Sequence, residues 1–346
     1  MPYQPLVSIV INNFNYARFL KEAIDSALAQ TYSYIEVIVV DDGSTDNSQK
    51  IINSYGNKII AIFQENGGQA SALNAGFMLC KGEVICFMDA DDIFFPQKIT
   101  QIVQIFAQID RKSGILLFHE LEAIDLNSKL LHFKKKLDCS LSDLNYRRAV
   151  TKPANQRVYK VCNSEEVYQH AIKYRYIPFL ANPTSSLCLN SSLGKKIFPL
   201  PQEGIKICAD VFLVKAASLL GEIYASDLCL GCYRMHDSNN YYEKKSKPLP
   251  KEYLFILDNY LNSKLQTIGK KSILSFFDSL HAQYYNRYYF SGNAGMIKNL
   301  SLAFKVLSWH TNKRTIIFTI KIINEVLFGF ISIRFSKIFS IRFKKK

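Results

Sequence analysis

The sequence has few of the features that mark a disulfide-stapled scaffold, an ATPase or a dinucleotide-binding protein. Its 346 residues contain eight cysteines, whose spacing matches no zinc or disulfide framework, and one tryptophan. This cysteine usage excludes a small stapled scaffold and suits a reducing cytosol. Neither G-x-x-x-x-G-K-[ST] nor G-x-G-x-x-G follows the first predicted strand, which disfavours ATPase chemistry and a dinucleotide site.

The composition is that of a folded globular protein. Hydrophobic residues make up 48% and charged residues 21% of the chain, and the length suits one large catalytic unit or two domains. The first residues lack the basic and apolar regions of a signal peptide. We therefore expect a cytoplasmic protein, with peripheral attachment to the inner face of the cell membrane as a further candidate.

Residues 7–118 alternate short β-branched runs with polar turns and segments of helical period. Nearly continuous apolar strands are typical of a parallel sheet whose crossovers are helices. The sequence therefore predicts an α/β fold, an open and mostly parallel sheet flanked by helices with a Rossmann-like nucleotide-binding half. The predicted strands are residues 7–11, 37–40, 59–63, 84–88 and 115–118.

Polar residues follow each of the first four predicted strands, and two of these ends are acidic. Asp41 and Asp42 follow the second strand, and Asp89, Asp91 and Asp92 follow the fourth. Because doubly wound sheets bind ligands outside the carboxyl ends of their strands, we expect these side chains near one pocket. Gathered carboxylates repel each other unless a cation lies among them, and hard oxygen ligands favour Mg²⁺ or Mn²⁺ with phosphate oxygens in the remaining positions. The pattern predicts a metal-dependent site for a phosphorylated substrate.

Five ordered blocks within residues 6–100 resemble the family 2 glycosyltransferases with the GT-A fold. The blocks are residues 7–15, 26–32, 36–46, 66–76 and 82–92. Their order and spacing are far more specific than a lone D-x-D motif. The resemblance implies a GT-A-type sheet and a bacterial, non-processive transferase that uses a nucleotide diphosphate sugar, with a UDP-sugar favoured.

The resemblance also assigns roles to side chains at the strand ends. Asp42 would hold the base and ribose of the nucleotide, Asp89 would contact the ribose or the sugar, and Asp91 would bind the metal on the diphosphate. Asp92 is interpreted as the cap of the next helix. The implied nucleotide-sugar contacts are Asn12, Asp41, Asp42, Gln69, Asn74, Asp89 and Arg234.

Two later segments extend the resemblance. Asp210 opens a predicted helix and matches the family's general base, which deprotonates the acceptor hydroxyl in an inverting transfer. Many relatives have Glu-Asp where this chain has Ala209 and Asp210. Arg234 and His236 resemble the family's R-x-H segment, in which histidine completes the metal site and arginine clamps the diphosphate. Without the resemblance, Asp210 would be interpreted as a helix cap and His236 as a loop hydrogen-bonder.

The predicted organisation is a transferase domain over residues 1–240, a helical appendage over residues 241–312 and a basic amphipathic tail over residues 313–346. Within the domain, residues 1–110 form the nucleotide-sugar half and residues 111–240 the acceptor half. The first half has 6 basic and 12 acidic residues, whereas the tail has nine basic residues and one acidic residue. No nucleic-acid partner is expected, and an anionic membrane surface is a candidate partner of the tail. An equally weighted alternative is that the tail forms a C-terminal helix packed on the domain, with a solvated end.

The function predicted from the sequence is transfer of one sugar to a glycan or lipid-linked acceptor, in cell-envelope or exopolysaccharide synthesis. The alternative is a catalytically inactive GT-A-like module for membrane-surface or protein interactions, which predicts loss of the acidic strand ends. A sugar-nucleotide pyrophosphorylase would need a glycine-rich basic loop after the first strand. A processive synthase would need Q-x-x-R-W, and the single tryptophan, Trp309, lies in a different context.

Overall fold

The computed structural model describes residues 3–131, 157–175, 177–203, 205–236, 239 and 251–274. The predicted basic tail, most of the predicted helical appendage and the stretch at residues 132–156 lie outside this described part. Within it, no helix combines the length and the apolar character that crossing a membrane requires.

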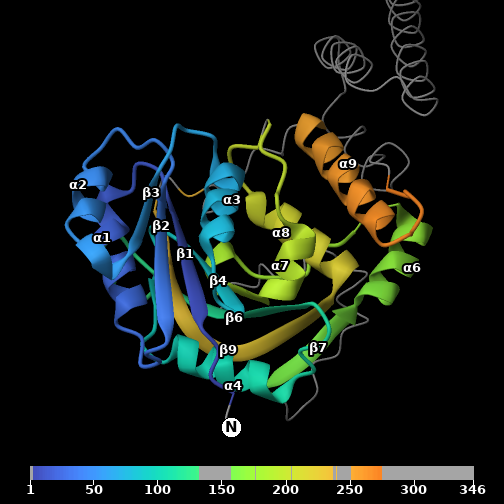
Figure 1. Ribbon diagram of the computed structural model, residues 1–346, viewed down its shortest axis with the longest axis horizontal. Coiled ribbons are helices and arrows are strands. Elements are labelled where there is room, and N and C mark those ends of the chain that lie inside the picture. Colours follow the sequence, from blue (N-terminus) through green and yellow to red (C-terminus); the bar gives the residue numbers. More distant parts are fainter. Residues whose placement is uncertain are drawn as a thin grey trace, which may run out of the picture.

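Four strands form a parallel half-sheet in the spatial order β3-β2-β1-β4 (Figure 1). β1 pairs in parallel with β2 on one side and β4 on the other, so one central strand aligns the carboxyl ends of its neighbours. Its side chains from Val7 to Ile11 are fully buried, as the continuous apolar run predicts. The bounds are β1 Val7–Asn13, β2 Ile35–Asp41, β3 Ile60–Phe63 and β4 Val84–Asp89.

The remaining strands make the other half of the sheet mixed. β8 runs antiparallel between β4 and β6, and the long β9 lies parallel to β6 but antiparallel to β5 and β7. The predicted open α/β sheet is confirmed, and its parallel character belongs to the first half, because a short buried run does not encode strand direction. The bounds are β5 Ile93–Phe94, β6 Ile115–Ile124, β7 Val158–Asn163, β8 Leu187–Asn190 and β9 Glu222–Arg234.

Helices cover both faces of the sheet and create two apolar cores. On one face, Ile9 and Ile11 of β1 pack in the same cluster as Leu20 of α1. On the other face, Val10 shares a cluster with Leu73 of α3. This alternation follows from the two-residue period of a strand. The helices are α1 Ala17–Leu28, α2 Ser48–Asn53 and α4 Lys98–Gln108 on the first face, and α3 Gln69–Leu79, α7 Ser191–Ile197 and α8 Ala209–Leu220 on the second.

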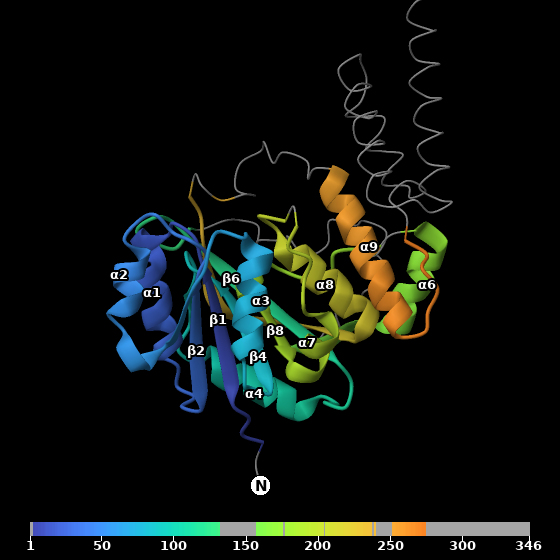
Figure 2. The same ribbon diagram turned by 45° about the horizontal axis from the view of Figure 1, so that its top comes forward.

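α6 (Ser164–Tyr174) and α9 (Lys251–Thr267) pack beside α8, and α9 is the described part of the predicted appendage (Figure 2). The Tyr253 hydroxyl donates to the carbonyl oxygen of Cys208, and the Tyr260 hydroxyl donates to that of Ile197 at 2.6 Å. Leu257 is buried in the same apolar cluster as α8. α9 therefore shares its core with the predicted domain over residues 1–240, while the domain boundaries stay predictions.

Candidate active site

The ends of β1 and β4 meet at one edge of the parallel half-sheet. The strand register places Asn12 opposite Asp89. Asn12 Nδ2 donates a hydrogen bond of 3.0 Å to Asp89 Oδ1. The predicted gathering of polar strand ends is thus observed as a direct contact between the first and fourth strands.

Asp41, at the end of β2, is enclosed by its own turn. It is 0% exposed, and its Oδ1 accepts hydrogen bonds from Asn13 Nδ2 at 2.7 Å and from Ser44 Oγ at 2.6 Å. The amide of Ser44 donates to the other carboxylate oxygen at 3.3 Å. Asp41 therefore holds the ends of β1 and β2 together. Its contact with a nucleotide stays a prediction.

Asp42 holds the loop that follows β3. Its Oδ1 accepts from Gln64 Nε2 at 2.6 Å and from the amide of Gly67 at 3.0 Å, and its Oδ2 accepts from the amide of Gly68 at 2.7 Å. Gly68 has a φ of 89°, and a Cβ there would lie 2.6 Å from Lys206 Cα, so this loop requires glycine. Asp42 holds the loop after β3 in place, and its contact with a nucleotide stays a prediction.

Gln69 connects the end of β4 to the start of α8. Its Nε2 donates to Asp89 Oδ1 at 3.2 Å, and its Oε1 accepts from the amide of Ala209 at 2.9 Å. One side chain thus spans the predicted nucleotide-sugar half and the helix that carries Asp210. The predicted acceptor-side base therefore lies beside the D-x-D segment.

Asp91 and His236 form the buried pair that the metal prediction named. His236 Nε2 lies 2.9 Å from Asp91 Oδ2, and the two side chains are 4% and 9% exposed. The imidazole is stacked on Phe19, with ring centroids 5.3 Å apart, and Tyr16 approaches it edge-on. Within the described residues, no group of three or more His, Cys, Asp or Glu side chains is placed to hold a metal ion. The protein offers two adjacent donor atoms here, one oxygen and one nitrogen.

The carboxylates of Asp89 and Asp210 lie in an environment that disfavours their charge. Burial raises the pKa of Asp210 to about 6. Burial, with the charges of Asp91 and Asp210, raises the pKa of Asp89 to about 7, although the hydrogen bond from Asn12 opposes the shift. Asp210 lies in the first turn of α8, where its Oδ1 accepts from the amide of Val211 at 3.0 Å, whereas the helix cap is Cys208. A carboxylate with a pKa near neutrality is suited to accept a proton.

Known proteins resemble this chain in sequence and in fold. The sequence profile described as "Glycosyl transferase family 2" matches residues 8–117. An uncharacterized glycosyltransferase of Nostoc sp. is 33% identical over 272 residues, which are 76% of this chain and 76% of that protein. The chain belongs to the family 2 glycosyltransferases.

Other relatives of this family 2 glycosyltransferase match smaller parts of it or its fold alone. An uncharacterized glycosyltransferase of Rickettsia typhi is 45% identical over 150 residues, and the chain covers 47% of that protein. The crystal structure of S. aureus TarS 1-349 in complex with UDP-GlcNAc superposes with a TM-score of 0.52 at 15% identity. That alignment covers 89% of this chain and 82% of the TarS chain. The GT-A-type fold of the transferase is thereby supported.

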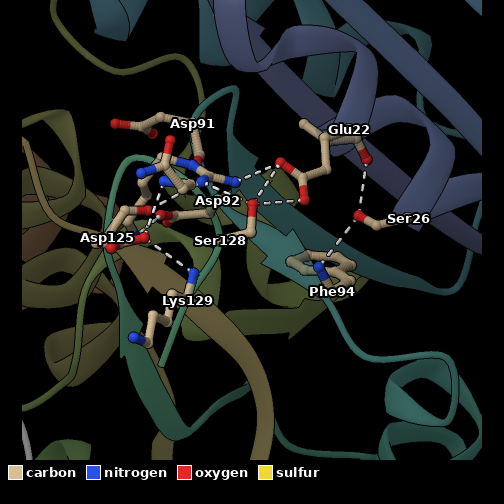
Figure 3. Close-up of polar contacts among 11 residues, drawn as sticks. Glu22, Ser26, Asp91, Asp92, Phe94, Asp125, Ser128 and Lys129 are labelled. Carbon is tan, nitrogen blue, oxygen red and sulfur yellow. Dashed lines mark hydrogen bonds and ion pairs between the residues drawn. The ribbon is translucent and has the colours of Figure 1, made fainter. Parts of the chain in front are cut away.

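Arg234 is held inside this glycosyltransferase. Its side chain is 1% exposed, and its contact with a diphosphate stays a prediction. Its Nε donates to the carbonyl oxygen of Asp91 at 2.8 Å, and its Nη2 lies 2.6 Å from Glu22 Oε2. Figure 3 shows Glu22, Asp91 and Ser128 converging at this position. Arg234 is an internal clamp, because protein acceptors engage its guanidinium.

Asn74 and Asp92 are two further residues with predicted roles. Asn74 uses both polar atoms of its amide on the backbone of Leu200, at 2.8 Å and 2.7 Å, so it fastens α3 to the loop after α7, and its contact with a nucleotide stays a prediction. Asp92 does not cap α4, because β5 intervenes and Gln97 occupies the cap position. Asp92 Oδ1 instead accepts from the amide of Arg234 at 2.9 Å.

Lys98 and Ser185 were not predicted from the sequence, and they hold the D-x-D segment of the glycosyltransferase in place. The amide of Asp89 donates to Ser185 Oγ at 3.0 Å, and the fully buried Lys98 donates from Nζ to the carbonyl oxygen of Ser185 at 2.7 Å. Lys98 Nζ also lies 3.3 Å from the centroid of the Phe94 ring. The available signal was spacing: Lys98 precedes the buried Ile102 by four residues and therefore shares the apolar stripe of α4.

Tyr16 is a second residue that the sequence did not mark. Its ring contacts His236 with centroids 5.6 Å apart. Burial raises its pKa, and the charges of Asp91 and Asp89 add to the shift. Its hydroxyl therefore stays protonated and borders the acidic cluster. In the sequence, Tyr16 resembles any aromatic residue at the start of an amphipathic helix.

Proposed function

We propose that this glycosyltransferase moves one sugar from a nucleotide diphosphate sugar to an acceptor hydroxyl, with inversion at the anomeric carbon and Asp210 as the general base. Asp210 would accept the hydroxyl proton as the acceptor oxygen forms its bond to the anomeric carbon and the bond to the nucleoside diphosphate breaks. The observation that carries this proposal is the meeting of the Asp89–Asp91 segment with Asp210 across Gln69. The raised pKa of Asp210, about 6, supports its role as base.

We propose a UDP-sugar as donor. TarS, which shares the fold, has been crystallised with UDP-GlcNAc. The amide and carboxylate groups of Asn12 and Asp89 lie together at the strand ends, where an α/β sheet binds its ligand. Such acceptors and donors suit the hydroxyls of a ribose or a sugar.

The residues present fit a divalent metal, and we propose Mg²⁺ or Mn²⁺. Asp91 Oδ2 and His236 Nε2 are 2.9 Å apart, close enough to bind one ion together. Mg²⁺ is commonly held by one or two carboxylates with phosphate oxygens and water in its other positions, and Asp91 supplies one such carboxylate. When bound, the ion would neutralise charge that develops on the departing diphosphate. Asp91 and His236 would hold it, and Tyr16 and Phe19 would limit the freedom of the imidazole.

The acceptor is proposed as a glycan or a lipid-linked sugar of the cell envelope, with the basic residues 313–346 holding the enzyme at an anionic membrane surface. The net charge of that segment motivates the second half of this proposal. Deleting residues 313–346 is expected to move the protein from the membrane fraction to the soluble fraction. An unchanged distribution after cell fractionation would contradict it.

Calorimetric binding of UDP, GDP and dTDP, with and without Mn²⁺, tests the donor site. We expect Mn²⁺-dependent binding of UDP to the wild type and its loss in Asp91→Ala. Asp110→Ala is the matched control, because Asp110 is an exposed aspartate in the loop after α4. Binding of none of the three nucleotides, or equal binding by Asp91→Ala and the control, would contradict the proposed site.

A further inference from the structure

One face of α1 contacts the end of β9. Tyr16, Phe19 and Glu22 are spaced three residues apart, so they are neighbours along the helix surface. Tyr16 and Phe19 flank the ring of His236. Phe19 also lies under Arg234, with Cζ 4.8 Å from the ring centroid, and Glu22 Oε2 is 2.6 Å from Arg234 Nη2.

Arg234 also contacts the D-x-D segment and so connects it to α1. Its Nε donates to the carbonyl oxygen of Asp91 at 2.8 Å, and its own amide donates to Asp92 Oδ1 at 2.9 Å. Two successive residues of the acidic turn are thereby fixed by one arginine. Because Asp91 also pairs with His236, the direction of its carboxylate depends on where Arg234 holds its backbone.

The turn after β6 completes the arrangement. Arg234 Nη1 donates to the carbonyl oxygen of Asp125 at 3.1 Å and to Ser128 Oγ at 3.0 Å. Ser128 Oγ in turn donates to Glu22 Oε1 at 2.8 Å. Figure 3 shows Glu22 and Ser128 facing each other, with Asp91, Asp92 and Asp125 beside them. Glu22 and Ser128 thus both engage Arg234 and each other.

Burial makes the carboxylate of Glu22 important to this arrangement. The Arg234 side chain is 1% exposed, whereas that of Glu22 is 45% exposed. A buried guanidinium requires an opposite charge, because removing one partner of such a pair leaves an uncompensated charge in a low-dielectric region. Without the carboxylate, the guanidinium would shift toward its remaining acceptors, which are the carbonyl oxygens of Asp91 and Asp125 and the hydroxyl of Ser128.

We propose that Glu22 and Ser128 are positioning residues of the transfer reaction, which act through Arg234 to fix the Asp91 backbone and to aim its carboxylate at His236. Neither residue touches the proposed substrate. The inference rests on the proposed function, because it treats Asp91 as part of the donor site. A role in stability alone would lower the unfolding temperature and leave the kinetics of the folded enzyme unchanged.

The test compares Glu22→Gln with Asp25→Asn, two carboxylate-to-amide changes on the same helix. Asp25 is 49% exposed and pairs with the surface residue Lys21, so its change is the matched control. Kinetics are measured well below each variant's unfolding temperature. We expect Glu22→Gln to lower kcat with the donor about tenfold or more, and to require several-fold more Mn²⁺ for half-maximal activity, since small displacements of reacting groups have large effects on rate. Asp25→Asn should stay within about twofold of the wild type.

A second variant avoids misfolding as an explanation. Ser128 has a φ of 62°, a conformation that glycine adopts without strain, so Ser128→Gly removes the hydroxyl and keeps the turn. Ser128→Gly should lower kcat severalfold. In the double variant Glu22→Gln/Ser128→Gly, the fall in kcat should be smaller than the product of the two single falls, because both residues act through Arg234.

The possible failures are distinguishable. An active wild type in which Glu22→Gln and Ser128→Gly match Asp25→Asn would overturn the positioning role and leave the proposed function intact. A wild type that turns over no nucleotide sugar would overturn both. An active wild type that needs no metal, but in which Glu22→Gln and Ser128→Gly still lower kcat, would contradict the proposed metal and support the positioning role.

Discussion

The ends of β2 and β4 carry similar acidic clusters in the sequence but differ in the structure. At the end of β2, hydrogen-bond donors of the protein surround Asp41 and Asp42. At the end of β4, burial raises the pKa of Asp89, and the charges of Asp91 and Asp210 add to the shift although Asn12 and Gln69 donate to its carboxylate. The first cluster holds loops in place, and the second gathers carboxylates whose charges oppose one another.

This difference teaches that burial together with crowding of like charges, rather than hydrogen bonding alone, distinguishes the β4 end from the β2 end. A carboxylate that accepts two or three protein hydrogen bonds is stabilised in its charged form, whereas crowded carboxylates are stabilised by a bound cation or a proton. The comparison therefore predicts that changes at the β4 end act mainly on activity. Changes at the β2 end should act mainly on stability.

The largest expected effect is on activity, from Asp210→Asn. Removing the general base should lower kcat about 10²- to 10⁴-fold, while binding of UDP stays close to that of the wild type. In the wild type, kcat/KM should rise as the pH passes through about 6, because Asp210 must lose its proton to act. Steady-state kinetics from pH 5 to 8 measure both quantities. Near-normal turnover by Asp210→Asn would show that Asp210 is not the general base.

A smaller effect, on stability, is expected from Asp41→Ala. The change leaves the buried donors of Asn13 and Ser44 without their acceptor, which costs about 1–3 kcal/mol of unfolding free energy. Chemical denaturation of the variant and of Asp110→Ala measures this difference. Equal unfolding free energies for the two variants would break the distinction between the β2 and β4 ends.

The smallest expected effect is a pH dependence of stability caused by Asp89. Its pKa in the folded protein, about 7, lies above the ordinary value of 3.8, so the folded state favours the protonated form. This contribution to stability is full below the ordinary pKa and is lost as the pH rises through the folded-state pKa. Without divalent metal, the unfolding temperature of the wild type should therefore fall from pH 5 to pH 8 by about 2 °C or more relative to Asp89→Asn. If the unfolding temperatures of the two proteins change equally between pH 5 and pH 8, the charge of Asp89 is already offset in the folded protein.

The parallel half of the fold and the D-x-D segment could be predicted because their signals are local. A continuous β-branched run indicates a buried parallel strand, and the residue that follows the strand lies at the edge of the sheet where ligands bind. Asn12 and Asp89 follow this rule and are in contact. The direction of β8 could not be predicted, because a four-residue buried run has no feature that distinguishes parallel from antiparallel pairing.

The burial of Arg234 could not be predicted for a different reason. The sequence contains no local sign that this arginine, two residues before His236, is buried. Its partners Glu22 and Ser128 lie 212 and 106 positions away in the chain. Only packing of α1 and the β6 turn against the end of β9 brings them together.

The sequence by itself determined the α/β class, the family and the presence of carboxylates at the strand ends, because these depend on patterns of adjacent residues. The tertiary structure alone decided which of these polar groups are buried among protein donors and which carboxylates are crowded together. That distinction depends on burial and on the donors that distant segments supply, as at Asp41 and Arg234. Side chains of the same chemistry therefore differ in their surroundings, because segments far apart in the sequence meet only in the folded chain.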